Sequence, residues 1–131
     1  MKNAMLLMLS LAAMGHSGLA QGTGTTSTPL LSKPAAGMPT KEIAMHTVEY
    51  QPGASDPVHR HDAQAMVYVL EGSVVMQVAG GMPATLKAGQ TFYESPGDIH
   101  TVAKNASQTE KAKFVVFFLK DKGTPTFLPV N

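Results

Sequence analysis

The placement of glycine and proline constrains this chain most strongly. Beyond residue 40, apolar residues come in short runs rich in Val, Phe, Tyr and Thr, and Gly or Pro interrupts them about every 8–12 residues. No window carries the period of an amphipathic helix. The pattern predicts an all-β protein, a small antiparallel jelly-roll β-barrel with a pocket at one mouth. The expected strands are Ile43–Gln51, Val58–His61, Met66–Glu71, Val74–Val78, Ala84–Leu86, Thr91–Glu94, Ile99–Lys104 and Lys113–Lys120.

The first twenty residues have the form of a secretory signal peptide. Lys2 precedes an apolar stretch from Ala4 to Met14, and small residues then lead to Ala20. A membrane anchor is disfavoured because small and polar residues interrupt the stretch before it reaches the ~20 residues that span a bilayer. We therefore predict cleavage after Ala20 and a soluble product that is exported, either periplasmic or secreted.

Residues 21–40 are rich in Gly, Thr, Ser and Pro and show neither strand nor helix periodicity. They are predicted to form a flexible N-terminal arm, which leaves 41–131 as one β-barrel domain. In an alternative arrangement, Leu30 and Leu31 lie across a partner subunit.

Charge and cysteine content exclude several classes of protein. Lys2 is the one charged residue in the leader, so the remainder carries 9 Lys+Arg against 9 Asp+Glu. A net charge of zero argues against nucleic-acid binding, which needs clustered basic residues, and no polybasic membrane anchor is present. The absence of cysteine excludes a disulfide scaffold, a thiolate metal site and a cysteine nucleophile.

Three histidines are candidate metal ligands. His59 and His61 are two residues apart, so on a strand their side chains leave the same face and direct two nitrogen donors at one point. His100 follows a turn that enters another predicted strand. The alternative for the first pair is two exposed strand histidines without a ligand. His46, on the first predicted strand, has no evident partner.

At these residues the sequence resembles the cupin superfamily over about residues 43–120. The family's motifs have the forms G-x5-H-x-H-x3/4-E-x6-G and G-x5-P-x-G-x2-H-x3-N. The resemblance implies a six- to eight-stranded β-barrel with a metal near one mouth. The matching positions are Gly53, His59, His61 and Gly72 in the first motif, and Gly89, Gly97 and His100 in the second.

The motif's glutamate is missing, since the spacing to the last glycine places Ala65 there. Gln64, one residue earlier, is a possible fourth ligand through its amide oxygen. Asn105 stands one residue beyond the second motif's asparagine. The implied cofactor is a divalent transition metal (Fe, Mn, Zn, Cu or Ni), and the sequence leaves its identity open.

Two adjacent residues are candidate catalytic groups, and strand alternation lets only one of them point inward. Glu94 shares parity with Phe92, so an inward Glu94 would act as a general base or as a replacement ligand. Tyr93 is the other candidate. In the alternative arrangement Glu94 faces solvent at the rim of the barrel.

Three functions remain open: a metal-dependent enzyme acting on a small organic molecule, a noncatalytic barrel that binds a small ligand or the metal itself, and a structural module with a vestigial site. The site favours an enzyme of dioxygenase or other oxidoreductase type. A homodimer is expected because Tyr68 and Leu70 offer apolar outer positions and Phe114–Leu119 is apolar almost without alternation.

Overall fold

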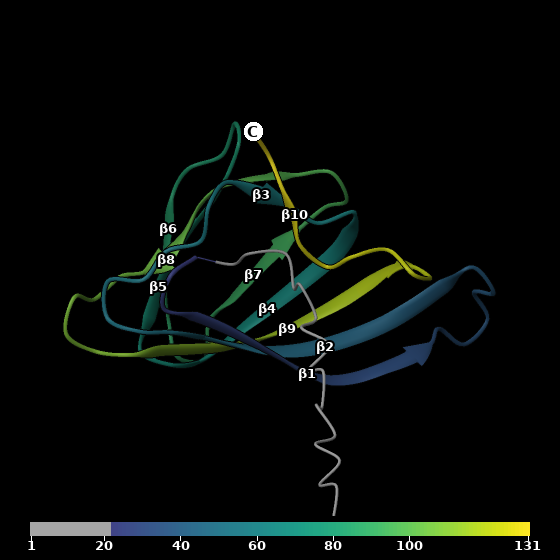
Figure 1. The fold of residues 1–131 in the computed structure, drawn as a ribbon, viewed down its shortest axis with the longest axis horizontal. Helices are drawn as coiled ribbons and strands as arrows, with labels where there is room; N and C mark the ends of the chain where they lie inside the picture. Colours follow the sequence, from purple (N-terminus) through teal and green to yellow (C-terminus); the bar gives the residue numbers. More distant parts are fainter. Residues whose placement is uncertain (1–21) are drawn as a thin grey trace, which may run out of the picture.

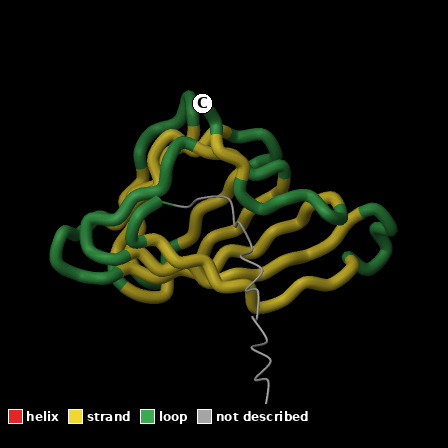
Figure 2. The backbone as a smooth tube through the Cα atoms, viewed as in Figure 1, coloured by secondary structure: helices red, strands yellow, loops and turns green. Residues whose placement is uncertain are grey.

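The computed structural model describes residues 22–131, which form ten β-strands and no helix (Figures 1 and 2). The predicted signal peptide and its cleavage position lie outside the described residues. Within the described part, no helix is long and apolar enough to cross a membrane. The strands are β1 Thr25–Pro34, β2 Lys41–Tyr50, β3 His59–Arg60, β4 Ala63–Glu71, β5 Ser73–Val78, β6 Ala84–Lys87, β7 Thr91–Glu94, β8 Ile99–Asn105, β9 Ala112–Asp121 and β10 Leu128–Pro129.

The strands form two five-stranded antiparallel sheets, which face each other across the core (Figure 1). One sheet has the order β1-β2-β9-β4-β7, and the other has the order β10-β3-β8-β5-β6. Every run expected from the sequence overlaps one of β2 to β9, so the prediction of an all-β antiparallel jelly roll is confirmed.

Strict alternation along the two central strands of the first sheet builds the core. The buried and less buried residues of β9 alternate along its whole length, and those of β4 do so from Ala63 to Val69. Each of the larger buried side chains contributes about 1.5–3 kcal/mol relative to full exposure. The inward side chains of these strands are Ala63, Ala65, Val67 and Val69 on β4, and Ala112, Phe114, Val116, Phe118 and Lys120 on β9.

The prediction of a flexible arm over 21–40 is wrong for most of its length. β1 pairs with β2 from Thr25↔Tyr50 to Pro34↔Glu42, with a bulge between Pro29 and Leu31. β1 is an edge strand, where proline is tolerated because one row of backbone groups needs no partner. Its side chains are mostly exposed, so it lacks the alternation by which strands are recognised. The folded domain therefore begins well before residue 41.

Gly72 makes the tight connection between β4 and β5, and thus between the two sheets. Its φ of +67° lies in the left-handed region that favours glycine. A Cβ atom at this position would lie 2.3 Å from the backbone oxygen of Lys111. Both the conformation and the space therefore require glycine here.

Asn105, whose role the second motif left open, anchors a loop. Its buried Nδ2 donates to the backbone oxygens of Gln51 at 3.1 Å and Glu110 at 2.7 Å. Its Oδ1 accepts a hydrogen bond from the backbone N of Ser107 at 2.9 Å. Asn105 therefore satisfies backbone groups that would otherwise be left without partners.

The outward side of β4 and β7 carries exposed large side chains. We call Met66, Tyr68, Leu70 and Tyr93 the apolar outer face. Beside β4 in the same sheet, β9 adds the half-buried residues Val115 and Phe117, which pair with Tyr68 and Met66.

Candidate metal centre

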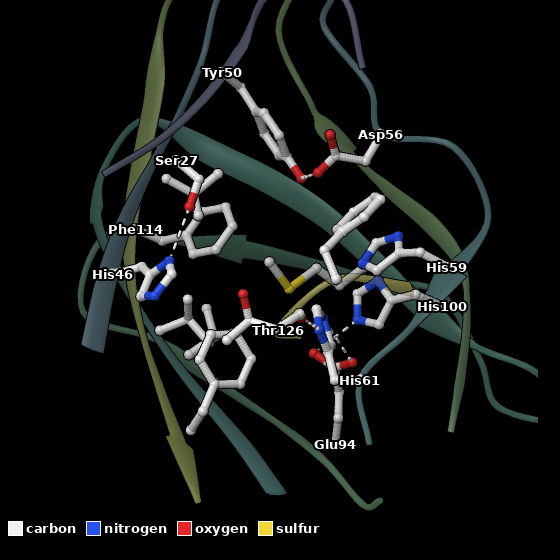
Figure 3. Close-up of a pocket in the computed structure, with 17 residues that line it drawn as sticks. Ser27, His46, Tyr50, Asp56, His59, His61, Glu94, His100, Phe114 and Thr126 are labelled. Carbon is white, nitrogen blue, oxygen red and sulfur yellow. Dashed lines mark hydrogen bonds and ion pairs between the residues drawn. The ribbon is translucent and has the colours of Figure 1, made fainter. Parts of the chain in front are cut away.

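A small cavity lies between the two sheets, and the three candidate histidines line it (Figure 3). Its volume is about 50 Å³. Valine, methionine and phenylalanine side chains form its apolar walls, and polar groups come from both sheets and from the segment after β9. The cavity has the mixed lining that is typical of small-molecule sites.

The fold brings together the three histidines singled out in the sequence. His59 on β3 pairs directly with His100 on β8, and each is only 3% exposed. The ring centroids of His59 and His100 are 4.9 Å apart. His61, just after β3, lies 4.9 Å from His59 and 6.1 Å from His100 by the same measure.

Two of these histidines have their ring tautomer fixed by backbone carbonyl groups. The Nδ1 of His59 lies 2.8 Å from the oxygen of Pro57, and the Nδ1 of His61 contacts the oxygen of Thr126. Because a carbonyl oxygen only accepts, each Nδ1 must donate, which leaves each Nε2 with a free lone pair. Metal-binding histidines commonly have this arrangement.

Burial also keeps these two imidazoles neutral. Desolvation lowers the pKa of His59 to about 4, outweighing the opposing effect of its hydrogen bond to Pro57. Burial likewise lowers the pKa of His61, although the nearby Glu94 carboxylate opposes the shift. Both side chains are therefore available as neutral nitrogen donors near pH 7.

Glu94 points into the same cavity, and the residue is only 2% exposed. Its Oε1 lies 2.9 Å from the Nε2 of His100, and its Oε2 lies 3.7 Å from the Nε2 of His61. The sequence left open whether Glu94 faces solvent, and the structure places it inside. Glu94 lies opposite Ala65 in the pairing of β7 with β4. A carboxylate thus reaches the cavity from the strand beside the position where the motif has its glutamate.

Several buried atoms of this cluster have unused bonding capacity. Glu94 Oε2 and both ring nitrogens of His100 have no hydrogen-bond partner of adequate geometry. Unpartnered buried polar atoms are uncommon and indicate a missing ion or water. Three imidazoles and one carboxylate also match the donor preferences of divalent transition metals. Among residues 22–131, no three His, Asp or Glu side chains are already arranged around one point as ligands, so ion binding requires the side chains of this cluster to shift.

The structure places Gln64 and Tyr93 outside the cavity, so neither serves as predicted. Ala63 and Ala65 point inward, and alternation therefore turns Gln64 outward. Tyr93 is 53% exposed, and its hydroxyl donates to the Oε1 of Gln64 at 3.3 Å. The two side chains interact with each other on the apolar outer face.

Two polar pairs in the cavity were not found from the sequence. The Tyr50 hydroxyl donates to Asp56 Oδ2 at 2.7 Å, and burial raises the pKa of Tyr50 well above its ordinary value. The Nδ1 of His46 lies 3.1 Å from the Oγ of Ser27. Alternation along β2 places both His46 and Tyr50 on the inward side with Ala44 and Val48. In Figure 3, Tyr50 and Asp56 lie at the end of the cavity opposite Glu94.

A jelly roll with histidines from neighbouring strands at an internal cavity defines a class of β-barrels that bind metals or small molecules. Residues 46–118, more than half of the chain, match the family model described as the Cupin domain. The chain therefore belongs to the cupin family.

The most similar curated proteins include plant oxalate oxidases. Oxalate oxidase GF-3.8 of Triticum aestivum is 27% identical over 134 residues, covering 96% of this chain and 58% of the relative. Oxalate oxidase 2 of Hordeum vulgare is 26% identical over 134 residues with the same coverage of 96% and 58%. This chain thus spans less than two thirds of the length of these relatives.

Solved structures give the same picture. An oxalate oxidase in complex with the substrate analogue glycolate has a TM-score of 0.63 at 25% identity, covering 82% of this chain and 55% of that one. DMSP lyase DddQ from Ruegeria pomeroyi has a TM-score of 0.65 at 19% identity, covering 81% of this chain and 51% of that one. The second likeness supports the fold alone.

Proposed function

We propose that this cupin is a metal-dependent enzyme that acts on a small organic molecule, with dioxygenase or other oxidoreductase chemistry. The observation that carries the proposal is the buried cluster of Glu94 with His59, His61 and His100, in which several donor atoms have no partner. The resident ion would be a divalent transition metal, either Fe, Mn, Zn, Cu or Ni.

In this proposal the histidines hold the ion, and Glu94 can serve both the ion and the substrate. His59 and His61 would hold the ion through Nε2, because Nδ1 of each is already committed to a carbonyl oxygen. Glu94 offers two oxygens, so one can bind the ion while the other accepts a proton from the substrate. The bound ion would supply Lewis acidity and, where it is redox-active, electron transfer. The apolar walls keep bulk water away from these groups.

Metal content and affinity test this proposal most directly. Protein purified without added metal is analysed for its elements, and the metal-free form is titrated with Co²⁺ as a probe. His61→Ala should reduce the affinity severely and leave the β-sheet circular dichroism unchanged. Gln64→Ala is the matched control on the outer face and should bind as the wild type does. Equal affinity in wild type and His61→Ala would rule out this site.

The relatives of this chain indicate which substrates should be assayed first. Because oxalate oxidases are among the relatives, the metal-loaded protein is assayed for dioxygen uptake with oxalate and other short carboxylic acids. Uptake that His61→Ala abolishes would support the oxidoreductase. Stoichiometric binding without turnover of any acid in this panel would instead support a binding protein.

The volume of the cavity favours a noncatalytic barrel as the second candidate. About 50 Å³ is far below the ~300–1,000 Å³ of ordinary ligand pockets. A barrel that only holds a metal, or a ligand of a few atoms, would need no more space.

We further propose that the chain is exported and forms a homodimer. Mass spectrometry of the exported protein should show a chain that begins at Gln21, and recovery of Met1–Ala20 in a membrane fraction would contradict this. The apolar outer face supports dimerisation, since Tyr68 and Leu70 are both more than 40% exposed. Light scattering at micromolar concentration should give twice the mass of the chain.

A further inference from the structure

The segment Thr124–Val130, here called the strap, crosses back from the end of β9 to the edge of the other sheet, where β10 lies (Figure 1). Its strand β10 pairs with β3, matching Leu128 with Arg60. The backbone N of Val130 donates to the oxygen of Val58 at 3.0 Å. These backbone bonds hold the strap against the very strand that carries His59.

Two successive residues of the strap contact two different histidines. The backbone oxygen of Thr126 accepts the Nδ1–H of His61, from 65 positions away in the sequence. The ring of Phe127 stacks on His59, with centroids 4.3 Å apart and planes inclined by 20°. Thr126 and Phe127 also line the cavity.

We propose that the strap is a positioning element, which sets the tautomer of His61 and the ring plane of His59 before an ion binds. If the Thr126 oxygen were absent, the proton of His61 would be free to move to Nε2. An Nε2–H imidazole has no lone pair to offer at that atom. If Phe127 were absent, His59 would keep its bond to Pro57 but lose the ring that fixes its tilt. The role in metal binding rests on the proposed function, whereas the effect on the imidazoles does not.

The contacts of the strap separate this role from general stability. No strap residue belongs to the buried hydrophobic cluster between the sheets. Thr126 and Phe127 are themselves partly exposed, and neither is among the partly buried residues that pack against this cluster. Changes in the strap should therefore alter the histidines more than they alter the fold.

The first test uses metal-free protein and ¹⁵N NMR of the histidine rings. In the wild type, His61 should be protonated at Nδ1, and the His59 ring protons should show the ring-current shift of a stacked phenyl group. Deletion of 124–131 should give a mixture of His61 tautomers. Phe127→Ala should remove the ring-current shift of His59. Leu128 is a strap residue outside the cavity, so Leu128→Ala should match the wild type.

Circular dichroism shows which of these variants fold. If the deletion variant does not fold, Phe127→Ala decides the outcome. An unchanged His61 tautomer in a folded deletion variant, or an unchanged His59 shift in Phe127→Ala, would overturn the proposal.

The second test titrates the same variants with Co²⁺ and records the visible spectrum of the complex. Phe127→Ala should bind about 10–100-fold more weakly, as is usual when a group that orients a ligand is lost, and the spectrum should change. Phe127→Tyr, which keeps the stacking ring, should restore the affinity to within about threefold of wild type. Wild-type affinity and spectrum in Phe127→Ala would contradict the proposal. A wild type that binds no Co²⁺ would contradict the proposed function instead, and the NMR result would then decide the role of the strap.

Discussion

The two sheets contribute to this protein in different ways. The sheet β1-β2-β9-β4-β7 has four long strands, and its strands β4 and β9 alone supply half of the buried apolar residues. The sheet β10-β3-β8-β5-β6 contains two strands of only two residues, yet β3 and β8 position the histidines. The carboxylate comes from β7, across the cavity. The candidate site therefore joins imidazoles from one sheet to an acid from the other.

The largest effect is expected when the carboxylate is removed from β7 and then restored on β4, the neighbouring strand of the same sheet. Glu94→Ala should weaken Co²⁺ binding about 1000-fold, or ~4 kcal/mol, because it removes the anionic partner of a buried charge. Adding Ala65→Glu in that background should recover most of the affinity, since the two positions are paired across β4 and β7. Titration of the purified variants measures both effects.

Gln64→Glu in the same Glu94→Ala background is the control, because it places a carboxylate on the apolar outer face. If Gln64→Glu restored the affinity as fully as Ala65→Glu does, the carboxylate would not need to occupy the inward position on β4.

The connection between the sheets should matter for stability but not for the site. Gly72→Ala should lower the free energy of unfolding by about 3 kcal/mol, because a left-handed conformation and a backbone clash act together. Gly80→Ala, at φ +82° with no atom within 4 Å of the added Cβ, should cost only about 1 kcal/mol. Urea unfolding of the two variants checks this, and equal losses would show that the clash at Gly72 is relieved without cost.

Acid should lower the free energy of unfolding of the metal-free protein, because it protonates His59 in the sheet that carries the histidines. The pKa of His59 is about 4 when folded and near 6.5 when unfolded, so the unfolded chain takes up the proton first. The contribution of neutral His59 is complete above pH 6.5 and is lost as the pH falls toward 4, with a loss of about 2.5 kcal/mol by pH 4.5. Urea unfolding across this range should show a steeper loss in wild type than in His59→Gln. Parallel curves for the two proteins would contradict this assignment.

The smallest difference is expected between substitutions on the outer faces of the two sheets. These substitutions should differ only in their effect on self-association. Tyr68→Ser should weaken the proposed dimer about tenfold, because a large exposed aromatic side chain is lost from the contact. The free energy of unfolding of the monomer should change by less than about 0.5 kcal/mol. Thr101→Ala, on the outside of the histidine sheet, should leave the dimer unchanged. Sedimentation equilibrium measures both, and equal dissociation of the two variants would place the interface elsewhere.

Most of the fold was predictable because glycine and proline mark nearly every strand end. β1 escaped prediction since an exposed edge strand with two prolines shows no alternation, and only its pairing with β2 makes it a strand. His59 and His61 followed from their spacing, because side chains at positions i and i+2 leave the same face of a strand, whereas His100 followed from the resemblance to the cupin motifs. Gln64 was predicted wrongly as a ligand, because strand alternation turns it outward beside the inward Ala65.

The other groups of the cavity depend on contacts distant in sequence. Ser27 reaches His46 only through the pairing of β1 with β2, and Thr126 reaches His61 across 65 residues. Whether Glu94 points inward depended on which face of β7 meets the core. Its parity with Phe92 was a correct but weak indication, because Phe92 itself is only partly buried.

The pairing of Ala65 with Glu94 has a stereochemical consequence. Neighbouring strands lie about 4.8 Å apart, so an acid on β7 approaches the imidazoles from one strand further along the sheet than an acid on β4 would. Ala65, fully buried, stands at the β4 position from which the motif's glutamate would have entered. A molecule that enters the site would therefore approach the three imidazole rings from a different direction. The order of the acid and the three rings around the site would also have a different chirality. Inhibitors shaped for a cupin with its acid on β4 should therefore fit this protein poorly, and their mirror-image forms should be ranked in a different order.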